Sequence, residues 1–199
     1  DPLHDFIPLM QISESPSLLA VPPSVPARSV KELLALARSR PGELNYGSAG
    51  PATNPHIAGE LFNLLGKVNI QAVHFKGGGP AIIAAISGEV GILFTNFAET
   101  SEFAKAGRLR ALGVSGTKRM ATLPEVPTIA EAGLPGYEFT TWHGMWVPKN
   151  TPRSIVALLN DRLKKAMAAP DQQKRFRDRG LDVIASSPEE FAAFVQSEH

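Results

Sequence analysis

The sequence predicts an α/β protein with one lobe built on a doubly wound parallel sheet and a second α/β lobe that is incomplete. Short apolar strands alternate with helices between residues 44 and 114, which is typical of a parallel sheet covered on both faces. Three helices then end the chain after an extended segment, with little sheet of their own to cover. We therefore predict a crossing strand and a remnant of the incomplete lobe at 1–20, the sheet lobe at 21–136, and a second crossing strand with the helices of the incomplete lobe at 137–199.

Composition excludes several kinds of chemistry. The 199 residues include 43% hydrophobic residues and no cysteine, so a core is expected and disulfides, thiolate zinc sites and cysteine nucleophiles are excluded. A net charge of +1 indicates no particular partner, and no apolar run is long enough to span a bilayer. Because the chain begins Asp-Pro without a methionine, we expect a processed or truncated product.

The first third of the chain is expected to form a strand and then a helix. Residues 6–21 are predicted to be extended because Pro8 and Pro16 exclude a helix. Three prolines then form a stiff link. Ser29 and Glu32 have the spacing of a capping box, which predicts a helix that ends at Pro41-Gly42.

The middle of the chain is expected to alternate strands and helices. The predicted strands are 44–47, 70–75, 90–94 and 109–114, and the predicted helices are 55–65, 80–87 and 97–106. In such sheets ligands bind outside the carboxyl ends of the strands.

Two glycine-rich turns fall at those strand ends. Residues 48–54 lead into the helix that begins at Pro55, and Lys76-Gly77-Gly78-Gly79 leads into a helix opened by Pro80. Unpaired backbone N–H groups and the positive end of a helix dipole suit a carboxylate or phosphate. The alternative is that the glycines only allow close packing of helix on strand. Neither turn has the Walker or the Gly-x-Gly-x-x-Gly spacing, so nucleotide chemistry is not expected.

The last third of the chain is predicted to be extended and then helical. Thr128 and Glu131 cap one helical turn, and residues 137–147 form an extended segment. Trp142 and Trp146 lie on one face of that segment, where burial is the default reading and contact of one with a ligand is the alternative.

Three helices are predicted to follow, at 153–167, 171–179 and 188–197, the last with a capping box at Ser187 and Glu190. Five apolar residues form one stripe at helical spacing on the first of them: Ile155, Leu158, Leu159, Leu163 and Met167.

Catalytic and metal-binding residues are not predicted. Ser48 is not in a Gly-x-Ser-x-Gly elbow, and no histidine pair has metal-ligand spacing. His56 is expected either to make a neutral hydrogen bond beside the anion or to pack under its loop, and His74 is expected in the core. Lys76 could attract an anion but is read more simply as a surface residue.

No paired carboxylates occur near the turns, and Glu60, Glu89 and Glu99 are predicted to be solvated helix or loop positions. A nucleic-acid partner is not expected, because the basic stretch after Lys149 has Phe176 as its only aromatic residue up to Asp182.

Several motifs in fixed order resemble those of the extracytoplasmic solute receptors of tripartite tricarboxylate transporters, the Bug receptors. They are residues 41–50 (PGELNYGSAG), 56–62 (HIAGELF), 75–81 (FKGGGPA), 107–114 (GRLRALGV) and 124–136 (PEVPTIAEAGLPG). The resemblance covers nearly the whole chain.

The resemblance implies a periplasmic-binding-protein-like fold, in which residues 8–21 and 137–147 match the two crossing strands. It also implies a periplasmic receptor without cofactors that captures a small organic carboxylate and hands it to membrane transporter subunits. The ligand-binding residues it implies are Ser48, Ala49, Gly50, Thr53, Asn54 and His56 in the first loop, Gly77, Gly78, Gly79, Pro80 and Ala81 in the second, and Thr95 and Asn96 at the next strand end.

The chain departs from the family pattern at two places. Thr95-Asn96 stands where members commonly have Asp-Asn, which affects ligand specificity. The resemblance also implies a block before this region that the sequence does not contain, and without it we expect an exposed sheet edge and apolar surface, with association or strand exchange between chains.

The function predicted from the sequence is therefore capture of a mono- or dicarboxylate for uptake. Two alternatives remain at this point: an enzyme acting on a small anionic metabolite at the same turns, for which His56 is the candidate base, and a sensor module that presents its ligand to a signalling partner.

Overall fold

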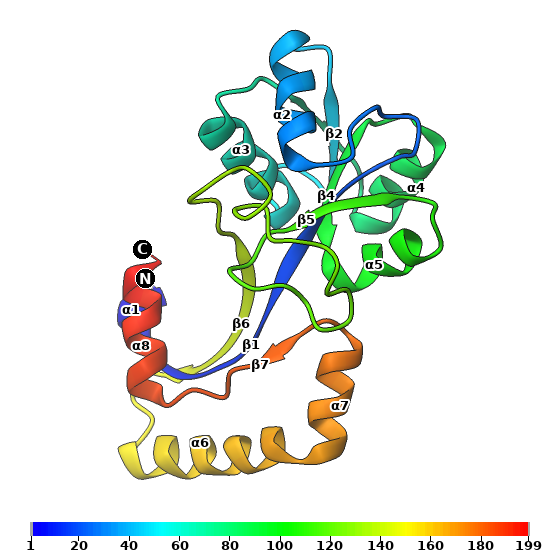
Figure 1. Cartoon of the computed structure of the whole chain (residues 1–199). Coiled ribbons are helices and arrows are strands. Elements are labelled where there is room, and N and C mark those ends of the chain that lie inside the picture. The colour runs from blue at the N-terminus through cyan, green and yellow to red at the C-terminus, as the bar shows by residue number, and fades with distance from the viewer. Residues whose placement is uncertain (1, 199) are drawn as a thin grey trace. The chain divides into compact units, whose positions relative to one another are not determined.

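The computed structural model describes residues 2–198, with side chains from His4 onward, and it divides into two compact units. We call residues 16–141 the sheet unit, and the described residues before Pro16 and after Thr141 the terminal unit. Two strands, β1 (Phe6–Val21) and β6 (Thr140–Pro148), each contribute residues to both units. Figure 1 shows the elements of each unit.

The sheet unit contains a mixed sheet with the strand order β3-β2-β4-β1-β5. The strands besides β1 are β2 (Asn45–Ser48), β3 (Gln71–His74), β4 (Ile92–Asn96) and β5 (Arg110–Val114). Strand β2 pairs in parallel with β3 and β4, whereas β1 pairs antiparallel with β4 and β5.

The α/β class is thus confirmed, but the prediction of a wholly parallel sheet is wrong at β1. Residues 18–21 of this strand are apolar and fully buried, as expected for a strand covered on both faces. The sequence shows this apolar run but not its partners, which lie more than 70 residues along the chain.

Helices cover both faces of the sheet (Figure 1). They are α2 (Val30–Ser39), α3 (Asn54–Gly66), α4 (Gly78–Ser87) and α5 (Phe97–Lys105). Leu19 and Phe94 pack in one buried cluster with α2 and α3, whereas Ala20 and Leu93 pack in another with α4. The alternation along β1 and β4 therefore places the core on both sides of the sheet.

The helix ends largely follow the predicted signals. Ser29 Oγ accepts a hydrogen bond from the Glu32 N–H, although the Glu32 carboxylate accepts from the N–H of Arg28 and not from that of Ser29. Helix α4 begins at Gly78, two residues before the predicted start at Pro80. A proline is tolerated there because the first turn of a helix has no intrahelical use for its N–H.

The terminal unit contains α1 (Pro2–Asp5), α6 (Arg153–Ala168), α7 (Pro170–Asp178), β7 (Asp182–Val183) and α8 (Pro188–Ser197). Strand β1 pairs here with β6 and β7, and Ser13 lies opposite Val183. The reciprocal capping box of Ser187 and Glu190 at the start of α8 is confirmed. The tryptophans of β6 pack on α8, where Trp142 and Trp146 each lie beside the ring of Phe191.

The apolar stripe predicted on α6 is not a core face. Ile155, Leu158 and Leu159 are 43%, 49% and 38% exposed, whereas Val156 and Asn160 are buried. The buried face is therefore turned away from these three side chains.

Candidate functional site

The two glycine-rich loops lie side by side at one edge of the sheet. Strands β2, β3 and β4 are parallel, so their carboxyl ends meet at that edge and the helices α3, α4 and α5 begin there. The loops are joined by hydrogen bonds: the N–H of Gly77 donates to the Ala49 carbonyl at 3.2 Å, and the N–H of Phe75 donates to the Ser48 carbonyl at 2.9 Å. The two glycine-rich loops, which were predicted at successive strand ends, are thus adjacent in the structure.

The loop after β2 satisfies several of its own N–H groups. Those of Gly50, Ala52 and Thr53 donate to Ser48 Oγ, His56 Nδ1 and the Gly50 carbonyl, at 3.4, 3.0 and 3.4 Å. The prediction of unpaired N–H groups is therefore wrong for these three residues. Ala52 has a φ of 56°, a left-handed conformation that costs free energy for any residue with a Cβ.

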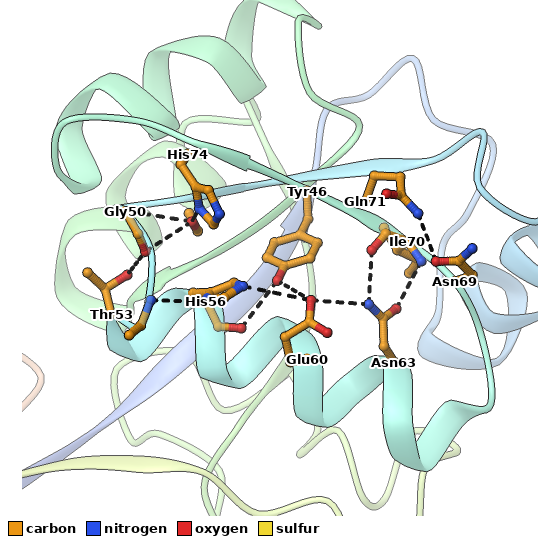
Figure 2. Close-up of polar contacts among 12 residues, drawn as sticks. Tyr46, Gly50, Thr53, His56, Glu60, Asn63, Asn69, Ile70, Gln71 and His74 are labelled. Carbon is orange, nitrogen blue, oxygen red and sulfur yellow. Dashed lines mark hydrogen bonds and ion pairs between the residues drawn. The ribbon is translucent and has the colours of Figure 1, made fainter.

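His56 fixes this loop through its ring (Figure 2). Because Nδ1 accepts the hydrogen bond from Ala52, the ring proton lies on Nε2, which is 4.0 Å from Glu60 Oε1. The structure agrees with a neutral, hydrogen-bonding histidine, and the partner it shows is the backbone of the loop itself.

His74 lies beside His56 and is not the core residue predicted from the sequence. Its side chain is exposed, its ring centroid is 4.8 Å from that of His56, and its Nδ1 is 2.7 Å from Ser48 Oγ (Figure 2). Strand β3 is at the end of the sheet, so a residue at its last position remains accessible. Ser48 itself is fully buried, so its hydroxyl serves this internal contact.

Tyr46 contacts the first two turns of α3 through its hydroxyl group. Its hydroxyl lies 2.8 Å from Glu60 Oε1 and 3.2 Å from the His56 carbonyl oxygen. Burial and the Glu60 carboxylate raise the pKa of Tyr46, so the hydroxyl remains a donor. Sequence reasoning missed this residue. The sequence feature that could have indicated it is Gly59, a glycine inside a predicted helix. A Cβ at Gly59 would lie 2.4 Å from the Tyr46 ring, so the glycine allows the ring to pack against α3.

The loop after β3 is more open than the first loop. Gly77 caps α4 with a φ of 109° and no side-chain hydrogen bond, and no described residue accepts from the N–H of Gly78 or Gly79. A Cβ at Gly77 or Gly79 would meet nothing within 4 Å. The prediction of an open amide end is therefore confirmed at α4, although Ala81 is itself fully buried.

Residues at the end of β4 hold α5 in place. Thr95 is buried and pairs with the hydroxyl of Thr100, and Asn96 Oδ1 accepts from the Ala98 N–H at 3.0 Å. In the first loop, Thr53 Oγ1 donates to the Gly50 carbonyl at 2.7 Å, and Asn54 Nδ2 donates to Thr141 Oγ1 at 2.9 Å. These four polar side chains therefore already have partners within the sheet unit.

One carboxylate near the site was not expected there. Glu99 on α5 is exposed, and its Oε2 is 2.9 Å from the position that a Cβ on Gly78 would take. Within residues 2–198 no group of three or more acidic or histidine side chains is placed to hold a metal ion, and no helix is both long and apolar enough to cross a bilayer.

An open sheet with helix N-termini gathered at its carboxyl edge is the architecture of a periplasmic-binding-protein-like ligand-binding domain. The chain belongs to the tripartite tricarboxylate transporter family receptors, whose family model matches residues 1–199. The predicted family and fold class are thus confirmed.

Two relatives show how much of the chain is shared. A UPF0065 protein in the tcbD-tcbE intergenic region of Pseudomonas sp. strain P51 is 40% identical over 196 residues, which are 98% of this chain and 58% of that protein. Protein BugT of Bordetella pertussis is 29% identical over 98% of this chain and 60% of its own length. The chain spans about three fifths of these relatives.

Two solved structures superpose closely on the chain. R. palustris Rpa4515 with adipate has a TM-score of 0.88 and 35% identity, over 100% of this chain and 66% of that one. MatC (Rpa3494) from Rhodopseudomonas palustris with bound malate has a TM-score of 0.85 and 32% identity, over 99% of this chain and 68% of that one. Both neighbours hold small carboxylates.

Proposed function

We propose that the chain is the larger part of a receptor that captures a small organic mono- or dicarboxylate for uptake by a tripartite tricarboxylate-type transporter. The observation that carries this proposal is the open amide end of α4, where Gly78 and Gly79 have N–H groups without an acceptor among the described residues. Backbone N–H groups at a helix N-terminus favour an anion. The adipate and malate of the two structural neighbours support a carboxylate as that anion.

The proposed ligand-binding residues contribute in different ways. We assign direct contact to backbone groups of the second loop and to the exposed side of the first, because the buried side chains of Ser48 and Thr95 already have internal partners. His56, Thr53 and Asn96 act by holding the loops in shape. The full proposed set is Ser48, Ala49, Gly50, Thr53, Asn54, His56, Gly77, Gly78, Gly79, Pro80, Ala81, Thr95 and Asn96.

The proposal includes a periplasmic location and membrane transporter subunits as partners, in line with the family to which the chain belongs. We also propose that this chain associates with itself.

Seven large apolar side chains of the described terminal unit are exposed: Phe6, Met145, Trp146, Ile155, Leu158, Leu159 and Ile184. Exposed apolar surface of this kind favours contact with another protein surface.

The experiment is a calorimetric and NMR titration of the chain with two dicarboxylates, adipate and malate, and with the monocarboxylate hexanoate. The variant is Gly79→Asp, which places a carboxylate at the second position of α4, where its Cβ has room. Its charge should compete with the ligand and weaken binding by about tenfold or more. Ser154→Asp places the same charge at the second position of α6 and should leave binding unchanged.

The expected result is a shift of the Gly78 and Gly79 amide resonances on titration, which Gly79→Asp weakens and Ser154→Asp does not. Absence of heat and of amide shifts with every carboxylate tested would overturn the proposal.

A further inference from the structure

Glu99 places a negative charge at the open amide end of α4. It is the third residue of α5, and its Oε2 is 2.9 Å from where a Cβ on Gly78 would lie. Gly78 is the first residue of α4, so this carboxylate lies at the N-terminus of that helix. Among the described residues, no other acidic oxygen is within 4 Å of a Cβ position on the glycines of this loop.

No partner within the described chain neutralises Glu99. The described residues offer it neither a hydrogen bond nor an ion pair, whereas Glu102, one turn further along α5, pairs with Lys105 at 2.8 Å. The first turn of α5 and the start of α4 are both positive ends of helix dipoles, which stabilise a carboxylate between them. The Glu99 carboxylate therefore occupies a position that also favours the carboxylate of the proposed ligand.

A carboxylate ligand that reached the N–H groups of Gly78 and Gly79 would lie close to this like charge. Repulsion between charges a few ångströms apart is substantial at the surface of a protein and increases with the number of charges on the ligand. A doubly charged ligand is therefore disfavoured more than a singly charged ligand of the same length.

We infer that Glu99 is a specificity-determining residue that selects against dicarboxylates in favour of monocarboxylates at the amide end of α4. This inference rests on the proposed function, and it narrows the ligand class from mono- or dicarboxylates to monocarboxylates.

The test compares adipate with hexanoate, which have six carbons each and differ in one carboxylate. Affinities are measured for the unaltered chain, for Glu99→Gln and for the matched control Glu102→Gln. Removal of the Glu99 charge should tighten adipate binding by about tenfold and hexanoate binding by less, and this gain should shrink at high salt. The control should leave the ratio of the two affinities unchanged. An unchanged ratio in Glu99→Gln, or weaker adipate binding, would overturn the inference.

A measurement without ligand separates this inference from the proposed function. The amide resonances of Gly78 and Gly79 should shift in Glu99→Gln and stay in place in Glu102→Gln. Unmoved amides in Glu99→Gln would overturn the inference while leaving the proposed function intact. If neither acid binds to any of the three proteins, the proposed function fails, and the selectivity assigned to Glu99 fails with it.

Discussion

The two units of the chain differ in how completely they bury their apolar residues. Three of the four buried clusters found in the described chain lie in the sheet unit, and the fourth, in the terminal unit, has only Leu9, Met10 and Val156 at its centre. Exposed large apolar side chains show the opposite distribution, with seven in the smaller terminal unit and four in the sheet unit.

This difference indicates where the chain obtains its stability. Burial of apolar surface is the main favourable term in folding, so the sheet unit should carry most of the free energy of unfolding. The proposed ligand site lies in that unit, on loops supported by a packed sheet. The terminal unit leaves apolar side chains of α6 and β6 in contact with solvent.

The largest expected effect comes from truncating the core of the sheet unit. Phe62 is fully buried, and its ring centroid is 5.6 Å from that of Phe94 and 6.1 Å from that of Tyr137. Phe62→Ala should lower the free energy of unfolding by about 3–5 kcal/mol, because it removes apolar contacts and leaves a cavity. Val156→Ala, in the small cluster of the terminal unit, is the comparison. Urea unfolding followed by circular dichroism measures both, and equal losses would contradict the contrast between the units.

A second prediction compares two glycines that each lie against a buried ring. A Cβ at Gly59 would lie 2.4 Å from the ring of Tyr46, and one at Gly144 would lie 2.1 Å from the ring of Phe191. Tyr46 is held by hydrogen bonds and the surrounding core, so Gly59→Ala should cost about 1–3 kcal/mol of unfolding free energy. Phe191 is also fully buried, but Trp146, which packs on it, is 37% exposed, so we expect these rings to shift at a lower cost.

Gly144→Ala should therefore lower the melting temperature by less than Gly59→Ala. The reverse order would show that the aromatic group of the terminal unit is the more rigid of the two.

A third prediction concerns acid and should affect both units alike. Each unit has a reciprocal capping pair, and the hydrogen bond from the N–H of Thr128 or Ser187 lowers the pKa of the partner carboxyl, Glu131 or Glu190. A carboxyl whose pKa is lower in the folded state contributes stability above its ordinary pKa, about 4.3, and loses it as the pH falls through the lowered value.

Glu131→Gln and Glu190→Gln should each flatten the decline in unfolding free energy below about pH 4.3. Glu89→Gln is the control, since Glu89 is exposed and its carboxylate has no hydrogen bond or ion pair with the described residues. An unaltered acid profile in both capping variants would mean that the caps are absent in solution.

Local signals in the sequence predicted the elements well. The spacing of Ser187 and Glu190, the glycines before α4 and the alternation of short strands with helices each depend on residues within a few positions of one another. The insertion of β1 between β4 and β5 depends on pairing across a long stretch of chain, which local periodicity does not contain.

In the site, too, local features could be predicted from the sequence and contacts between distant residues could not. The open N-terminus of α4 follows from its glycines, and the sequence predicted it. The internal acceptors could not be predicted, because His56 Nδ1 takes the N–H of Ala52 only when the loop turns back on its helix. His74 was misread for a related reason, since its exposure depends on the order of strands in the sheet. Glu99 is exposed, as predicted, but its proximity to Gly78 depends on how α4 and α5 lie in space and could not be predicted.

The smallest expected effect lies on the exposed face of α6. Leu158 is 49% exposed, so Leu158→Gln should change the free energy of unfolding by no more than about 0.5 kcal/mol. Leu163→Gln, on the side of α6 that packs against the buried cluster, should cost more. If this face mediates the proposed self-association, light scattering over a range of concentrations should show less association for Leu158→Gln at unchanged stability. A large loss of stability in Leu158→Gln would instead mean that the side chain is buried in solution, and the contrast between the two units would then be smaller than the structure indicates.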